Sequence, residues 1–161
     1  RNVGVLEASG IIPAASYHSA ELHDALSDRE HYFDKLAGIA KGKHIVFFDE
    51  DNGLEVKSVK KGRSRSSKYL YWDEVERFYE AGQSLLIYQH FRRMKREKFI
   101  HDMAQEIQQR TGAPWVCPLT TKHVVFFLVP QQAHEAELNA LSKTVIEKWE
   151  PHIWDGLKTS Q

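Results

Sequence analysis

The sequence lacks most of the features that would place it in a specialised class of protein. It contains one cysteine, Cys117, so an internal disulfide is excluded and a reducing cytoplasm is the expected location. No apolar run approaches the roughly 18 residues of a membrane-spanning helix, and no secretory signal is visible. We therefore expect a cytoplasmic protein without a membrane partner.

A strong net charge is also missing. The 22 basic and 22 acidic residues give a formal net charge of zero, which excludes the global basic field that many nucleic-acid-binding proteins carry. A length of 161 residues suits a single domain with a substantial core, so we interpret residues 1–161 as one α/β domain. The sequence opens at Arg1 rather than methionine, and a fragment without its N-terminal part is the second interpretation.

Hydrophobic periodicity predicts alternating helices and strands. It indicates helices over 27–40, 73–81, 94–110 and 132–149, and strands over 44–48, 84–88, 115–119 and 123–129. Ser27-Asp28-Arg29-Glu30 has the form of a capping box at the start of the first helix. Three residues separate the last two strands, which predicts an antiparallel hairpin. The expected fold is a three-layer, Rossmann-like α/β sandwich whose mixed sheet ends in this hairpin.

Polar residues follow the first two predicted strands at the edge where open α/β sheets bind ligands. If the strands are parallel neighbours, the two groups meet, and His90 can act there as an acid or a base. A polar turn at Asp-Asn-Gly and a histidine that caps a loop are the structural alternatives. The candidate catalytic residues are Asp49, Asp51, Asn52, Gln89 and His90.

The same acidic motif allows a metal site. Carboxylate oxygens are typical ligands of Mg²⁺, and the candidates are Asp49, Asp51 and Glu55. Glu55-Val56-Lys57 also has the Glu-x-Lys form of many metal-dependent nucleases, in which the lysine stabilises charge or helps to activate water.

Two basic clusters follow the same two strands, so both are expected around one rim. Basic side chains beside an acidic pocket suit a phosphate-bearing polymer, because they hold the backbone while the pocket performs chemistry. Two solvated charge runs are the alternative. The candidate nucleic-acid-binding residues are Lys57, Lys60, Lys61, Arg63, Arg65, Lys68, Arg92, Arg93 and Arg96.

Two resemblances add to this interpretation. The motifs Phe-Phe-Asp-x-Asp-Asn-Gly-Leu-Glu, Ser-Ser-Lys-Tyr-Leu-Tyr-Trp-Asp-Glu and Leu-Leu-Ile-Tyr-Gln-His-Phe are similar to those of a family of uncharacterised bacterial proteins, from about His44 to Val129. The order of elements, with its final hairpin, resembles the C-terminal half of the Rossmann-like methyltransferases that use S-adenosylmethionine. In that family a short polar motif ends the strand that corresponds to 44–48. The glycine-rich cofactor loop of the family does not occur in these residues.

We therefore expect a methyltransferase-like enzyme that acts on nucleic acid or a nucleotide, with S-adenosylmethionine as the cofactor that the resemblance implies. Asp49, Asp51 and Asn52 would orient the target group. The alternatives are a Mg²⁺-dependent nuclease that uses Asp49, Asp51, Glu55 and Lys57, and a non-catalytic module that binds nucleic acid or protein. The oligomeric state is left open.

Overall fold

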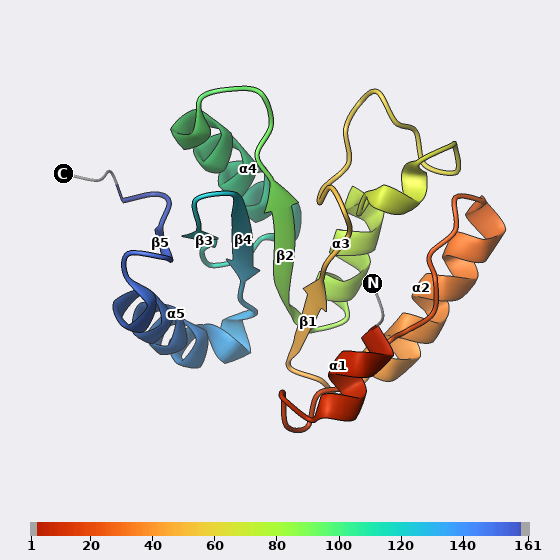
Figure 1. Cartoon of the computed structure of the whole chain (residues 1–161), viewed down its shortest axis with the longest axis horizontal. Helices are drawn as coiled ribbons and strands as arrows, with labels where there is room; N and C mark the ends of the chain where they lie inside the picture. The colour runs from red at the N-terminus through yellow and green to blue at the C-terminus, as the bar shows by residue number, and fades with distance from the viewer. Residues whose placement is uncertain (1–2, 159–161) are drawn as a thin grey trace.

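The computed structural model describes residues 3–158, which form five helices, two short 3₁₀ turns and five strands (Figure 1). The periodic segments of the sequence all become regular elements of the predicted type. In chain order these are α1 (Val3–Ser9), α2 (Leu26–Ala40), β1 (Ile45–Phe48), η1 (Ser66–Lys68), α3 (Trp72–Glu80), β2 (Ser84–His90), α4 (Arg96–Thr111), β3 (Cys117–Thr120), β4 (Val124–Val129), η2 (Gln132–His134), α5 (Glu135–Trp149) and β5 (Trp154–Asp155).

The five strands form one mixed sheet in the order β1-β2-β4-β3-β5. Strands β1 and β2 are parallel neighbours, with Phe47 opposite Leu86. The hairpin prediction is confirmed, since β3 and β4 pair antiparallel, and β4 also pairs antiparallel with β2. The carboxyl ends of β1 and β2 therefore lie side by side, and the chain leaves both strands at the same edge.

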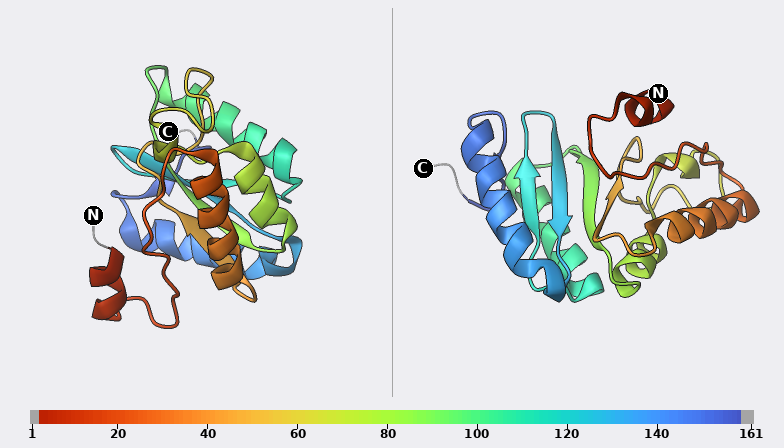
Figure 2. Two further views of the ribbon diagram at one scale, coloured as in Figure 1. Left: turned by 90° about the vertical axis from the view of Figure 1, so that its right-hand side faces the viewer. Right: turned by 90° about the horizontal axis from the view of Figure 1, so that it is seen from below.

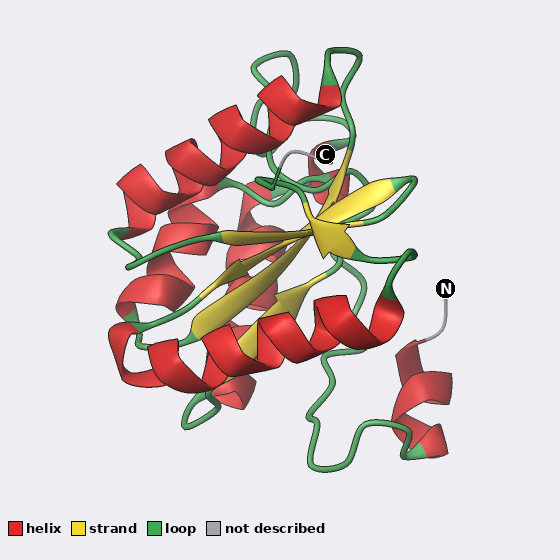
Figure 3. Cartoon of the chain, turned by 90° about the vertical axis from the view of Figure 1, so that its left-hand side faces the viewer, coloured by secondary structure: helices red, strands yellow, loops and turns green. Residues whose placement is uncertain are grey.

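The helices cover the two faces of the sheet unequally. Alternate strand residues such as Val46, Phe48 and Ile87 point into the main core, which also contains Phe33 of α2, Phe78 of α3 and Ile107 of α4. On the other face α5 packs against β3 and β5. Figure 3 shows the twist of the sheet, with α1 set apart from it; Figure 2 shows the same separation in two further views.

The Cys117 side chain faces α5, where its thiol hydrogen-bonds to Ser142, and burial raises the pKa of this thiol to about 11. At neutral pH the thiol is therefore protonated, and it is unreactive as a nucleophile.

Two local predictions need correction. The capping box at Ser27 is wrong, because α2 begins one residue earlier and its N-cap residue, Ala25, makes no side-chain cap. Arg29, a member of that motif, instead turns inward and is fully buried. The final helix predicted over 132–149 begins as a 3₁₀ turn and becomes α-helical at Glu135.

Within residues 3–158, no helix combines the length and apolarity that crossing a membrane requires.

Candidate functional site

The side chain of Gln89, in β2, forms hydrogen bonds with the backbone of the turn that follows β1. The Gln89 amide is almost fully buried and donates to the carbonyls of Asn52 (3.1 Å) and His90 (2.8 Å). Its carbonyl oxygen accepts from the Leu54 amide at 2.8 Å. Gly53 has φ +80°, and a Cβ there would lie 2.6 Å from the Gln89 oxygen, so only glycine fits. Gln89, a predicted catalytic residue, thus places its amide under the turn and fixes the turn's shape.

Arg92 joins the loop after β2 to the segment after β1. Its guanidinium donates to the carbonyl oxygens of Leu54 (3.2 Å) and Glu55 (2.8 Å). The Glu55 carboxylate accepts from the backbone amide of Trp72 at 2.9 Å, at the first residue of α3. A carboxylate in this position stabilises the start of a helix. The two loops therefore form one continuous edge.

Asp49, Asp51 and Glu55 are not assembled as a metal site. Among residues 3–158 no group of three or more His, Cys, Asp or Glu side chains is arranged to hold a metal ion. Asp49 and Asp51 are exposed, and Asp51 lies 3.9 Å from the Lys68 ammonium. For Glu55 to bind Mg²⁺, its carboxylate would have to release or share the Trp72 amide.

His90 ends β2 as an exposed side chain. Its Nε2 atom lies 2.9 Å from the Tyr88 hydroxyl, and the two rings meet nearly at a right angle. The contact orients the imidazole on the sheet face opposite Gln89, because successive residues of a strand point to opposite faces. Gln89 and His90 are therefore neighbours in sequence but separated by the sheet.

Buried charges hold the long segment between β1 and α3. Arg29 donates to both carboxylate oxygens of Glu74, and to the carbonyls of Ser66 (3.0 Å) and Tyr69 (2.6 Å). Glu74 also receives Lys61 at 2.9 Å and the backbone amide of Tyr71 at 2.9 Å. Every charge in this network has several partners. Lys61, which the sequence predicts to bind nucleic acid, therefore forms an ion pair with a buried carboxylate.

Asp24 fixes the other side of this segment. Its carboxylate accepts from the backbone amides of Ser67 (2.7 Å) and Arg65 (2.9 Å). These hydrogen bonds lower the pKa of Asp24 to about 2. Arg65 adopts φ +72°, a left-handed conformation that few non-glycine residues take, and the Asp24 contact helps to hold it.

Glu50 is an unusual group that the sequence interpretation does not single out. Its Oε2 atom is buried without a hydrogen-bond partner in the described structure, although the residue as a whole is partly exposed. Burial, reinforced by the negative charges of Glu74 and Asp49, raises the pKa of Glu50 to about 7; its own backbone amide and Arg29 oppose the shift. Strand alternation is the signal that could have found it, because residue 50 continues the inward series of Val46 and Phe48.

The Tyr32 side chain lies close enough to Glu50 for the Glu50 charge to affect its pKa. Burial and the charge of Glu50 raise the pKa of Tyr32 to about 12. The Tyr32 ring in turn packs against His18, at 4.4 Å between ring centres. Burial, followed by the charge of Lys35, lowers the pKa of His18. The Glu50 carboxyl is therefore near an aromatic side chain, Tyr32, that is uncharged at neutral pH.

Most of the predicted basic residues are exposed around the edge. Lys57, Lys60, Arg63, Arg65, Lys68, Arg92, Arg93 and Arg96 all lie at the surface. Two of them are partly ordered by aromatic rings: Arg96 lies over Phe91 at 4.7 Å and Arg92 lies 5.8 Å from the Phe99 ring centre. We call these eight residues the basic rim.

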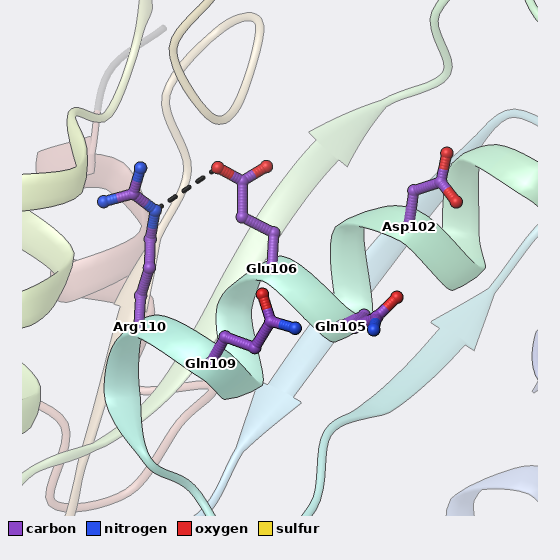
Figure 4. Close-up of a pocket in the computed structure, with 5 residues that line it drawn as sticks. All are labelled: Asp102, Gln105, Glu106, Gln109 and Arg110. Carbon is purple, nitrogen blue, oxygen red and sulfur yellow. Dashed lines mark hydrogen bonds and ion pairs between the residues drawn. The ribbon is translucent and has the colours of Figure 1, made fainter.

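A shallow surface hollow lies away from this edge, on α4. Figure 4 shows its lining residues, which all project from α4: Asp102, Gln105, Glu106, Gln109 and Arg110. One exposed helix face cannot enclose a ligand, and its Glu106–Arg110 ion pair is an ordinary surface pair. The hollow is therefore not a candidate site.

Comparison with protein families, with curated proteins and with solved structures gave no match to this chain, so its site is interpreted from its own geometry.

Proposed function

We propose that this protein is a methyltransferase-like domain that binds nucleic acid along the edge where β1 and β2 end. The observation that carries the proposal is the parallel pairing of these strands, which brings the acidic motif and both basic clusters to one edge. Arg92 and Gln89 then tie the two loops together through backbone carbonyls and amides. A backbone polyanion is the class of ligand that such a rim suits.

The charge balance of the rim supports this partner. Within residues 3–158, Lys57, Lys60, Arg63 and Arg93 make no ion pair with an acidic side chain. These four side chains are exposed. Basic side chains that already pair with an acid attract phosphate weakly. Basic side chains without an acidic partner replace the counterions that surround a nucleic acid, and the release of these counterions supplies affinity. The chain therefore has a locally basic edge although its formal net charge is zero.

The sheet order favours the methyltransferase-like part of the proposal. A parallel pair, followed by a hairpin whose second strand inserts antiparallel beside β2, corresponds to the resemblance drawn from the sequence. A three-layer Rossmann-like fold would place the site at the carboxyl ends of β1 and β2, where open α/β sheets bind ligands. The exposed Asp49 and Asp51, with Asn52, would orient the target group there.

The described residues do not fit S-adenosylmethionine by themselves. In residues 3–158 the first strand is β1, and the turn that follows it is acidic rather than glycine-rich. Carboxylates do not provide the backbone cradle that such a cofactor loop supplies. The described residues would therefore act on the substrate side, where they would bind and orient the acceptor.

The nuclease alternative has less support, because Glu55 is engaged by Trp72 and, within residues 3–158, no ligand group is assembled around Asp49. Glu55→Gln distinguishes the two: a Mg²⁺-dependent nuclease loses cleavage, while a methyltransferase-like binder keeps its affinity for nucleic acid.

The decisive experiment measures binding of the whole chain to a fluorescent oligonucleotide of about 20 nucleotides by anisotropy at several salt concentrations. We expect affinity to fall steeply with salt, and the quadruple variant Lys57→Ala, Lys60→Ala, Arg63→Ala and Arg93→Ala to bind more weakly. The slope of log affinity against log salt should become shallower by about one for each phosphate that the variant no longer neutralises. Affinity that does not respond to salt would reject the proposal.

The matched control removes charge from a distant helix. Lys143 and Lys148 are exposed on α5, on the far side of the hairpin from the rim. The Lys143→Ala, Lys148→Ala double variant should leave the salt slope unchanged. The control removes two charges and the rim variant removes four, so an equal loss of affinity for each charge removed would mean that binding follows overall charge rather than the rim.

A further inference from the structure

The two faces of the sheet differ at β1 and β2. On the covered face, Val46 and Phe48 are buried under α2 and α3, while on the other face Ile45 and Phe47 are 42% and 52% exposed. Helix α5 packs against the β3 and β5 end of that second face. Figure 1 looks onto it: β1 and β2 lie in front of α3 and α4. We call this surface the open face.

Aromatic side chains from three strands gather on the open face. The Phe47 ring of β1 lies 6.2 Å from Phe126 of β4, and Phe126 lies 5.6 Å from Tyr88 of β2. Tyr88 in turn meets His90 at 5.1 Å. The four rings form a continuous strip, of which Phe47 and His90 are the most exposed members. A single exposed aromatic is ordinary, whereas a partly exposed aromatic strip across three strands is typical of a surface that binds a partner.

The strip runs directly into the basic rim. His90 is the last residue of β2, and Arg92 and Arg93 follow it in the next loop. Phe47 is one residue from the end of β1, after which the acidic motif and the first basic cluster begin. Side chains that can stack on bases and side chains that can hold phosphates are therefore adjacent at one end of the sheet.

We propose that the open face binds single-stranded nucleic acid, with bases stacked on Phe47, Tyr88 and Phe126 while the backbone follows the basic rim. The inference rests on the proposed function and specifies its substrate class. In a duplex the faces of the bases are already stacked on one another, whereas an unpaired strand presents them to aromatic side chains. The positive rim selects a polyanion over an apolar protein partner for the same surface.

The test compares three ligands of matched length with the full chain: a single-stranded oligothymidine, the same backbone with abasic sites, and a duplex. The first two carry equal charge, so their difference isolates stacking. We expect the oligothymidine to bind at least about tenfold more tightly than the abasic strand, since each stacked base contributes appreciably to affinity. Phe47→Ala should remove most of that difference, while Ile45→Ala, a matched exposed residue on the same strand and face, should preserve it.

Circular dichroism is needed to check that both variants fold, and Tyr88→Ala with Phe126→Ala repeats the test on the remaining rings. If the basic-rim variants weaken binding but the abasic strand binds as well as oligothymidine, the stacking inference fails and the proposed function stands. If no ligand shows salt-dependent binding, the proposed function fails and the inference fails with it. Self-association that Phe47→Ala abolishes, without a stacking difference, would assign the open face to a second copy and overturn the inference.

Discussion

Consecutive acids at the end of β1 face in opposite directions, and their surroundings differ accordingly. Glu50 points inward, toward α2 and the buried pair of Arg29 and Glu74, and one of its oxygens has no hydrogen-bond partner within the described structure. Asp49 and Asp51 point outward to solvent beside the basic rim. On the inner side of this segment the Arg29–Glu74 ion pair is buried, while on the outer side the ion pair of Asp51 with Lys68 is exposed.

This difference separates structural from functional charge. Buried ions contribute to a fold only when each has a partner, so Arg29 and Glu74 belong to the framework. Exposed ion pairs contribute little to stability, so the exposed pair of Asp51 with Lys68, at 3.9 Å, is expected to add little to the free energy of unfolding. Glu50 is intermediate, because the residue is partly exposed while its Oε2 atom is buried without a hydrogen-bond partner in the described structure.

The largest expected effect comes from breaking the inner pair. Arg29→Met leaves the Glu74 carboxylate buried with Lys61 as its remaining cation and leaves the carbonyls of Ser66 and Tyr69 without this donor. We expect the free energy of unfolding to fall by about 3–5 kcal/mol, measured by urea denaturation followed by circular dichroism.

Arg77→Ala provides the matched control, because Arg77 forms an exposed ion pair with Asp34 at 2.7 Å. Its cost should remain below about 1 kcal/mol. Equal costs for the two arginine variants would show that the buried network does not stabilise the segment after β1.

The position of Arg29 also shows what sequence reasoning could and could not reach. Helices and strands followed from periodicity, and the pairing of β3 with β4 followed from the short connection between them. The motif around Ser27 resembles a cap, and nothing local indicates that its arginine crosses 45 positions in sequence to meet Glu74. Long-range ion pairs depend on tertiary packing, which a single sequence does not encode in any local pattern.

The candidate site divides in the same way. Parallel pairing of β1 with β2 was sufficient to predict that both polar groups meet at one edge. The tasks of Gln89, Glu55 and Arg92 were not predictable, because each bonds to backbone atoms of another loop. The inward orientation of Glu50 could have been predicted, because the alternation of β1 places residue 50 on the inner face. Three adjacent acids, however, are also typical of one exposed cluster.

A smaller effect is expected from the titration of Glu50. Its pKa rises from an ordinary value of 4.5 to about 7 in the folded protein, so the folded state binds more protons than the unfolded state between these values. The free energy of unfolding should therefore fall as the pH rises from about 4.5 to 7, by roughly 1–3 kcal/mol. In Glu50→Gln this contribution disappears, and the variant should be more stable than the wild type at pH values above about 8.

The difference in the free energy of unfolding between the wild type and Glu50→Gln isolates the titration of Glu50 from that of the other groups. His18 has a lowered pKa, so its contribution to stability falls as the pH drops below 6.5, opposite in sign to that of Glu50. Asp24, whose pKa is about 2, loses its contribution only as the pH falls below about 4. Both groups are retained in Glu50→Gln and cancel in the difference. Parallel pH profiles of the two proteins would contradict the inward placement of a titrating Glu50.

The smallest effect on stability is expected on the outer side of the segment. Asp49→Asn and Asp51→Asn change exposed side chains, and the ion pair of Asp51 with Lys68, at 3.9 Å, is itself exposed. The free energy of unfolding should stay within about 0.5 kcal/mol of the wild type. Removing these negative charges from the rim should at the same time tighten salt-dependent oligonucleotide binding slightly, because fewer charges repel the phosphates.

The two measurements on these variants decide how the outer acids are used. A loss of stability comparable to that of Arg29→Met would place Asp49 and Asp51 in the framework and remove the distinction between the two sides. Unchanged stability with tighter oligonucleotide binding would show that these carboxylates contribute neither to the stability of the fold nor to the binding of phosphate. That result would be consistent with a role in orienting a target group.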